Sequence, residues 1–281
     1  MTLQANGYLQ IRNFVNDKLI ASLNNELDEI FKSPTINGSY GYIRFGKNIK
    51  AVPFPFIYIK SLNLMEMVID IADRLNAESN SDNEYELREL SIFSEHGDEN
   101  ILPWHTDKNP GALLVLCYLR GGAAKSGGSL FMRGTHIETY GPLHQLSESD
   151  ISRYSDSLVD LSGQPGDVNI YYVNGFHSRH PVIEERRVIR IWFNQKNNPN
   201  VKKMDYDDFG IPVSLLTTRV LKALPTLFRV HDNLPKFGDS YVGTSTSAWN
   251  PVYVGSGDLF RHFWQHAKQK LISVVKQLFR A

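Results

Sequence analysis

Apolar and polar residues follow two different periods along residues 1–195. In segments 16–31 and 62–76 apolar residues recur every three to four positions, which predicts two helices that each bury one face. Elsewhere the apolar residues form short runs separated by glycine-rich and polar turns, which predicts strands. The expected strands lie at 8–11, 86–93, 101–107, 112–119, 129–132, 168–173 and 186–193.

This order of elements predicts a protein that is mainly β with flanking helices. Many short strands joined by glycine-rich turns are typical of a jelly-roll barrel, also called a double-stranded β-helix, whose outer face the amino-terminal helices would cover. We therefore assign residues 1–195 to such a core. Segment 33–56, rich in glycine, proline and aromatic residues, is either a long connection that completes the core or a lid over a pocket.

The chain changes character after Gln195, so residues 196–281 are expected to be a carboxy-terminal helical extension. Segment 196–208 is polar, and a helix is predicted within 211–227. In segment 257–281 an apolar stripe with Trp264 faces a basic side. Such a helix either docks on its own protein or a partner subunit, or makes peripheral contact with a membrane.

Composition excludes several classes of function. Lys + Arg and Asp + Glu total 30 each, and this balance argues against a general nucleic-acid binder. The single cysteine, Cys117, lies in an apolar run and is expected to be a packed core residue. The start of the chain lacks the pattern of a secretory signal, and no apolar run has the length of a membrane span. These features favour a cytoplasmic, reducing compartment, which also suits ferrous iron.

Two imidazoles and one carboxylate give the sequence its most specific chemistry. His105 and Asp107 occupy positions i and i+2 of an expected strand, so their side chains point to one face while Thr106 points away. His177 follows the buried run 168–173 and completes the set if the sheet curls round on itself. Two histidines and one carboxylate form the triad that holds Fe(II) with open coordination positions. The same ligands also suit zinc in a hydrolytic enzyme.

Three arginines, Arg186, Arg187 and Arg190, stand in the strand predicted after His177. A guanidinium is planar and binds a carboxylate through two parallel hydrogen bonds, which a lysine does not do. Arg187 is the first choice for such an anchor, with Arg186 and Arg190 as alternatives. A solvated strand edge is the competing interpretation.

The order of these motifs resembles the phytanoyl-CoA dioxygenase-like branch of the Fe(II)/2-oxoglutarate-dependent oxygenases. The resemblance depends on His105-Thr106-Asp107, on GGSLFMRGTH at 127–136, on Pro165-Gly166-Asp167, and on His177 followed by an arginine. Segment 6–14 looks like the opening strand of that branch. Segment 177–182 is also similar to the distal motif of the prolyl-hydroxylase-type branch. The likeness covers residues 6–195.

The resemblance implies an iron site made by His105, Asp107 and His177. It implies 2-oxoglutarate as cosubstrate, anchored by Arg187 and lying near Tyr118, with O2 as the second cosubstrate. For Tyr118 the alternative is a core tyrosine. The expected reaction is hydroxylation of an unactivated C–H of a small-molecule metabolite, with release of succinate and CO2. Alternatives are a hydroxylase of a lipid or lipid-linked substrate at a membrane surface, and a non-catalytic module that binds metal and 2-oxoglutarate.

Two further histidines and the carboxylate at position 107 refine this expectation. His177 is preferred to His180 because Pro181-Val182 follows it as in the resembled pattern. His136 is expected to hydrogen-bond within its turn. Halogenating relatives have a small residue where Asp107 stands, so the carboxylate favours hydroxylation over halogenation. The substrate and the oligomeric state are not indicated by the sequence.

Overall fold

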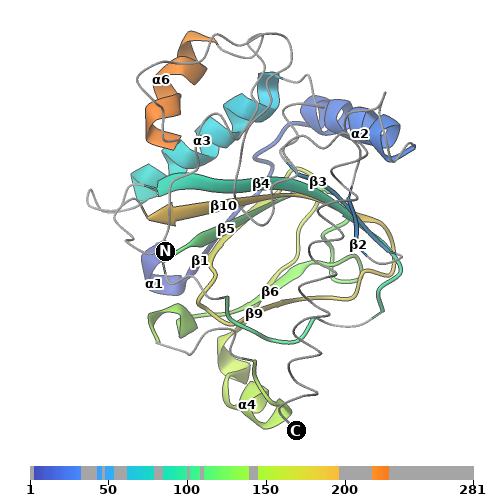
Figure 1. Cartoon of the computed structure of the whole chain (residues 1–281). Coiled ribbons are helices and arrows are strands. Elements are labelled where there is room, and N and C mark those ends of the chain that lie inside the picture. Colours follow the sequence, from blue (N-terminus) through green and yellow to red (C-terminus); the bar gives the residue numbers. More distant parts are fainter. Residues whose placement is uncertain are drawn as a thin grey trace, which may run out of the picture.

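A computed structural model of the chain has ten strands and several flanking helices among the residues that it describes (Figure 1). It describes residues 3–32, 43–45, 48–53, 62–78, 85–99, 102–107, 111–138, 145–195 and 217–227. The strands are β1 Tyr8–Ile11, β2 Ile43–Phe45, β3 Ile49–Pro53, β4 Tyr85–Glu95, β5 Leu113–Arg120, β6 Ser129–Met132, β7 Leu158–Leu161, β8 Val168–Tyr172, β9 His177–Arg179 and β10 Arg186–Gln195. The helices are α1 Leu3–Asn6, α2 Asp17–Lys32, α3 Leu62–Glu78, α4 Glu148–Arg153 and α6 Thr218–Leu227, with short 3-10 turns at Thr135–Ile137 and Ser155–Ser157.

The strands form two antiparallel sheets that face each other. The seven-stranded sheet has the order β1-β8-β5-β10-β4-β3-β2, and the three-stranded sheet has the order β7-β6-β9. In the centre of the large sheet, neighbouring strands (β1-β8-β5-β10-β4) come from distant parts of the sequence, which is the winding of a jelly roll. The predicted fold class, mainly β with flanking helices, is therefore confirmed.

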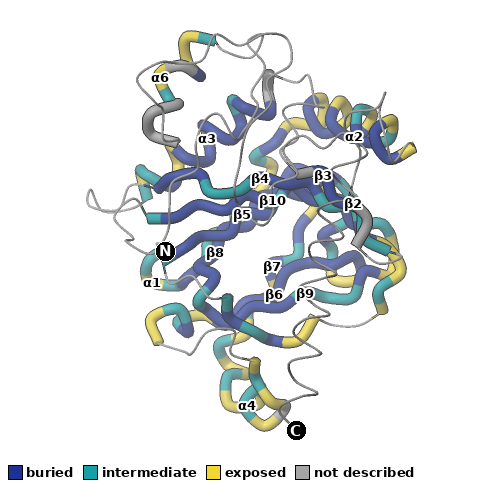
Figure 2. The backbone as a smooth tube through the Cα atoms, in the orientation of Figure 1, coloured by how far each residue is buried: buried dark blue, intermediate teal, exposed yellow. Residues whose placement is uncertain are grey.

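The central strands β5 and β8 of the large sheet are buried almost throughout, whereas β1 at its edge is half-buried (Figure 2). Helices α2 and α3 cover the outer face of the sheet, where one apolar core includes Leu23, Leu64 and Ile189. A second core lies on the inner face, between the sheets, and includes Leu116, Phe131 and Trp192. Because β5 is covered on both faces, its sequence is a continuous apolar run, whereas β4 alternates polar and apolar residues. Cys117 is buried in the outer core, as predicted.

Of the strands predicted from the sequence, the one at 101–107 is not found as a continuous strand. Within its described part, residues 102–107, only His105 forms isolated bridges, with Gln145 and His177. Pro103 has no N–H, so this segment cannot pair at every position. Two further backbone amides of this segment form separate hydrogen bonds outside any regular ladder: Leu102 donates to the carbonyl of Arg179, and Asp107 donates to the carbonyl of Val173.

Only one helix of the predicted extension lies within the described residues. Helix α6 packs against α3, where Arg219 forms ion pairs with Asp70 and Asp73. The predicted basic helix at 257–281 and most of segment 33–56 lie outside the described ranges, so the proposed division at residue 195 stays a prediction. Among the helices described, none is long and apolar enough to span a bilayer.

Candidate functional site

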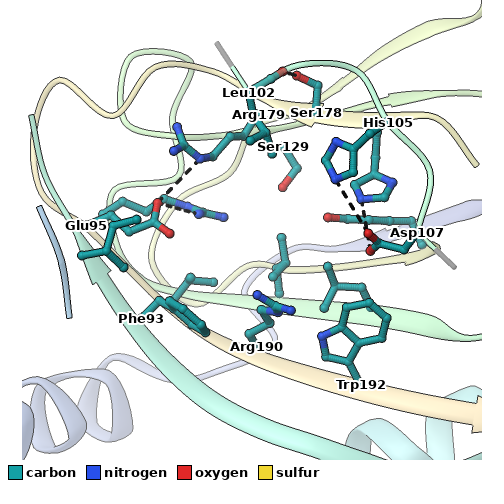
Figure 3. A pocket seen from close by; sticks show the side chains of 17 residues that line it. Phe93, Glu95, Leu102, His105, Asp107, Ser129, Ser178, Arg179, Arg190 and Trp192 are labelled. Atoms are coloured by element: carbon teal, nitrogen blue, oxygen red, sulfur yellow. Dashed lines mark hydrogen bonds and ion pairs between the residues drawn. The ribbon is translucent and has the colours of Figure 1, made fainter. Parts of the chain in front are cut away.

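Three potential metal ligands from distant parts of the chain meet between the two sheets (Figure 3). The ligand atoms of His105, Asp107 and His177 all lie within 4.8 Å of one another. Nε2 of His105 is 3.9 Å from Oδ1 of Asp107, and Nε2 of His177 is 3.6 Å from Oδ2 of the same carboxylate. Within the described ranges, no other group of histidine, cysteine or acidic residues comes together in this way. The three residues singled out in the sequence are therefore brought together.

Backbone pairing places the two histidines side by side. The amide N–H of each donates to the carbonyl of the other, with N–O distances of 3.1 Å and 3.0 Å. Their imidazole centroids lie 4.3 Å apart. Asp107, two residues after His105, points to the same side, as the i, i+2 spacing predicts. One local antiparallel contact thus replaces the regular strand that was expected here.

Each imidazole is also held in one tautomer. Nδ1 of His105 lies 2.7 Å from the carbonyl oxygen of Pro103, and Nδ1 of His177 lies 2.9 Å from that of Gly175. A carbonyl oxygen can only accept, so Nδ1 carries the proton in each ring and Nε2 presents its lone pair to the site. Burial, followed by the nearby charge of His105, lowers the pKa of His177 to about 4. Both features favour a neutral imidazole that is ready to bind a metal.

The triad opens into a cavity of about 350 Å³ between the sheets. Apolar side chains of the large sheet, among them Leu114, Leu116 and Val188, form one wall. The donor set fits Fe(II): His105, Asp107 and His177 would hold the ion with two neutral imidazoles and one carboxylate, and further ligands could approach it from the cavity that the three residues line.

Arg187, the first choice for a carboxylate anchor, does not line this cavity. Its side chain lies on the outer face of β10, where Nη2 contacts Asp28 at 2.8 Å and Glu185 at 2.7 Å. Nη1 donates to the side chain and the carbonyl of Asn24 in α2. The expectation for Arg187 is therefore corrected: its guanidinium joins α2 to the sheet. Side chains alternate along a strand, so its neighbours Arg186 and Val188 point the opposite way, into the cavity.

Arg186 is the buried guanidinium at the end of the cavity away from the triad. Its Nη1 donates to Oε2 of Glu95 at 3.2 Å, and Arg179 approaches the same oxygen at 3.7 Å. Burial alone would lower the pKa of Arg186, but the carboxylate of Glu95 outweighs it and raises the pKa. Nε of Arg186 is buried and has no hydrogen-bond partner among the described residues. The bond to Glu95 uses Nη1, so this cavity-lining guanidinium keeps donor capacity for a ligand.

Tyr118 lies directly beside this arginine but does not itself line the cavity. Its ring centroid is 5.8 Å from Cζ of Arg186, and its hydroxyl lies 2.9 Å from Oγ of Ser129. The same hydroxyl accepts from the amide of Ser129 and from Nδ2 of Asn169. With both lone pairs used, the Tyr118 hydroxyl donates its proton to Ser129, whose own proton can then be donated into the cavity. Ser129, Glu95 and Arg179 were not singled out from the sequence, although Ser129 follows the Gly127-Gly128 pair.

The two other histidines considered in the sequence lie outside the triad. Nε2 of His136 lies 2.8 Å from the carbonyl oxygen of Gln4, and its ring stacks on Tyr172 with centroids 5.1 Å apart. His180 pairs with Asp160 at 3.2 Å. His136 therefore has a structural role, but the expected hydrogen bond within its own turn is wrong, because its side chain bonds to Gln4 in α1.

No protein-family model and no curated protein matches this sequence. Solved structures do match the fold. The epimerase SnoN, in complex with Fe3+, alpha ketoglutarate and nogalamycin RO, aligns with a TM-score of 0.53 at 13% identity over 69% of this chain and 81% of its own. EvdO2 from Micromonospora carbonacea var. aurantiaca, complexed with 2-oxoglutarate, aligns with a TM-score of 0.52 at 16% identity over 71% and 92%.

HygX from Streptomyces hygroscopicus, with nickel and 2-oxoglutarate bound, aligns with a TM-score of 0.50 at 15% identity over 73% of this chain and 89% of its own. At such identities the likeness establishes the fold. The chain therefore has the double-stranded β-helix fold of these non-heme, 2-oxoglutarate-binding enzymes, and the resemblance seen in the sequence is confirmed at the level of the fold.

Proposed function

We propose that this protein is an Fe(II)- and 2-oxoglutarate-dependent oxygenase that hydroxylates an unactivated C–H of a small molecule. One observation carries the proposal: His105, Asp107 and His177, whose ligand atoms lie close together, line the same cavity as a buried arginine, Arg186, whose Nε has no partner among the described residues. A chelating keto acid with a second carboxylate needs both of these features. The matched enzymes that bind metal together with 2-oxoglutarate support it.

Arg186 replaces Arg187 as the proposed anchor of 2-oxoglutarate. Its Nε–Nη2 edge can donate two parallel hydrogen bonds to the distal carboxylate of the cosubstrate, while Glu95 keeps Nη1 in place. The Ser129 hydroxyl, oriented by Tyr118, supplies a further donor to the cosubstrate. The chain thus binds the two ends of a dicarboxylate at opposite ends of one cavity.

When bound, iron would supply the oxidising chemistry with 2-oxoglutarate and O2: one atom of O2 enters succinate as CO2 is released, and the other enters the hydroxylated substrate. The chain itself holds both imidazoles in the ligating tautomer, orients the cosubstrate and lines the remaining space with apolar walls that exclude water. Asp107 retains the carboxylate position that is small in halogenating relatives, which favours hydroxylation.

Succinate release tests the proposal. Anaerobically purified protein with added Fe(II) and 2-oxoglutarate should release succinate slowly on admission of O2, even without a substrate. His177→Ala should reduce this release below detection, because two ligands do not retain the metal. His180→Ala is the matched control, since that imidazole pairs with Asp160, and it should keep the wild-type rate.

Three results would contradict the proposal. Activity with zinc and without O2 would indicate a hydrolytic enzyme. Tight binding of iron and 2-oxoglutarate without turnover over a broad substrate panel would indicate a binding module. Equal losses in His177→Ala and His180→Ala would remove the triad from the reaction.

A further inference from the structure

We propose that Arg190 is the counter-ion for an anionic group, a carboxylate or a phosphate, on the substrate. This inference rests on the proposed function and narrows its substrate class. Arg190 lines the same cavity as the metal triad, between Phe93 and Trp192 (Figure 3).

The place of Arg190 on β10 separates it from the cosubstrate anchor. Arg186, Val188, Arg190 and Trp192 alternate with outward-facing residues along the strand, and all four line the cavity. The Cα atoms of Arg186 and Arg190 are four residues apart on a strand, or about 13 Å. The proposed cosubstrate site uses the triad and Arg186, so it does not require the Arg190 guanidinium, which can bind another ligand in the same cavity.

Arg190 differs from the other two arginines of the cavity in having no acidic partner. Arg186 pairs with Glu95, and Arg179 pairs with Glu95 and Asp98. No hydrogen bond or ion pair joins the Arg190 guanidinium to a residue that the structure describes, and its Nε is buried without a partner. A half-buried guanidinium without an acceptor is costly, and a ligand anion would remove that cost.

Aromatic contacts hold the guanidinium but do not satisfy it. Its Cζ lies 5.2 Å from the ring centroid of Phe93 and 5.3 Å from that of Trp192. Ring faces stabilise the cation, but they accept none of the N–H bonds in the guanidinium plane. The N–H groups of Arg190 are therefore available to a ligand, and the contacts with the two rings fix the direction in which they point.

A second arginine adds to the positive charge at this place. Cζ of Arg88 lies 5.4 Å from the ring centroid of Trp192, and Nη1 of Arg88 also has no partner. Burial lowers the pKa of Arg88, and the nearby charge of Arg190 lowers it further, although Glu89 and Asp107 oppose this. Arg88 stands where the pairing of β4 with β10 shifts register, which turns it toward Trp192. The region around Trp192 thus favours a negative ligand.

Matched fragments test the inference on protein loaded with Ni(II) and saturating 2-oxoglutarate. The probes are phenylacetate and phenyl phosphate, with phenylacetamide as the neutral match, and binding is followed by ligand-observed NMR. Their rings suit the apolar and aromatic walls. Wild type should bind at least one anion about tenfold more tightly than the amide, which is typical of one charge-assisted pair. The two anions distinguish a carboxylate from a phosphate.

Three variants show whether Arg190 causes that preference. Arg190→Gln should reduce the preference to less than twofold, and Arg190→Lys should keep part of it because the charge remains. Arg74→Gln is the matched control, since Arg74 lies on α3 and pairs with Glu78, and it should keep the full preference. The affinity for 2-oxoglutarate, measured by calorimetry on the same samples, should change less than threefold in Arg190→Gln.

Each other outcome has a definite meaning. If 2-oxoglutarate fails to bind wild type, the proposed function fails first. If it binds and wild type shows no preference for anions, the inference fails alone and the contacts of Arg190 with aromatic rings are only structural. If Arg190→Gln loses 2-oxoglutarate while Arg186→Gln keeps it, Arg190 is the cosubstrate anchor and the inference is overturned.

Discussion

The two faces of β10 put the same residue type to opposite uses. On the outer face both terminal nitrogens of Arg187 are bonded to protein groups, to Asn24 and Asp28 of α2 and to Glu185. Nε has no partner among the described residues in any of the three arginines, so the difference lies in the terminal nitrogens. On the inner face Nη1 of Arg186 bonds to Glu95, and no described residue bonds to the terminal nitrogens of Arg190. A guanidinium whose terminal nitrogens are bonded to protein groups stabilises the fold, whereas one that lines a cavity with fewer such bonds is available to a ligand.

The largest effect expected from this comparison is on cosubstrate affinity. Arg186→Gln should raise the Kd of 2-oxoglutarate about 100-fold, or ~2.7 kcal/mol, because it removes one partner of a buried, charge-assisted pair. Arg187→Gln should change that Kd less than twofold. Calorimetric titration of the Ni(II)-loaded variants measures both. Equal losses would mean that the two faces are not functionally distinct.

The second effect is on stability, where Arg187→Gln is expected to have the larger effect and Arg186→Gln the smaller. Arg187→Gln should lower the free energy of unfolding by about 2 kcal/mol, less than the 3–5 kcal/mol of a fully buried pair. The discount applies because Asp28 and Glu185 are 39% and 37% exposed, and Arg120 also contacts both. Urea unfolding of the metal-free protein measures it, with Arg74→Gln as an exposed control expected to change by less than about 0.5 kcal/mol. A loss no larger than that of the control would contradict the stabilising role.

The pH dependence of that loss has a definite sign. Burial alone would raise the pKa of Asp28 and of Glu185, but Arg187 and Arg120 outweigh it and lower both. A carboxyl with a lowered folded pKa stabilises the protein above its ordinary pKa of about 4, and this contribution is lost as the pH falls through the lowered value. The gap between wild type and Arg187→Gln should therefore narrow in acid. A constant gap would mean that Arg187 acts through its contact with the ring of Phe31.

The sequence predicted which three side chains meet between the sheets, but its first choice of anchor, Arg187, lies on the face of β10 that points away from the cavity. His105 and Asp107 are found by their i, i+2 spacing, which holds for one bridge as well as for a full strand. In β10 both faces are apolar, so no alternation tells which of Arg186 and Arg187 points inward. The pairing of Glu95 with Arg186 joins residues distant in sequence, and no local pattern predicts it.

The smallest effect on cosubstrate affinity is expected at Gly127, a glycine that leaves space for the side chain of Arg186 on the inner face of β10. A Cβ at Gly127 would lie 2.4 Å from Cδ of Arg186, and this glycine has a φ of +74°. Gly134 has a similar φ of +82°, yet a Cβ there would meet nothing within 4 Å. Gly134→Ala should therefore cost only the backbone strain of about 1 kcal/mol and leave 2-oxoglutarate binding unchanged.

Gly127→Ala should add to that strain a displacement of Arg186, and thus raise the Kd of 2-oxoglutarate about fivefold, less than removal of the guanidinium does. The contacts of Arg187 with Asp28 should persist, because they lie on the opposite face. Calorimetry and urea unfolding of the two alanine variants separate the backbone cost, which they share, from the contact with Arg186, which only one of them makes. Equal Kd values in both variants would show that the arginine can move without loss of the cosubstrate, and Arg186 would then not be a fixed anchor.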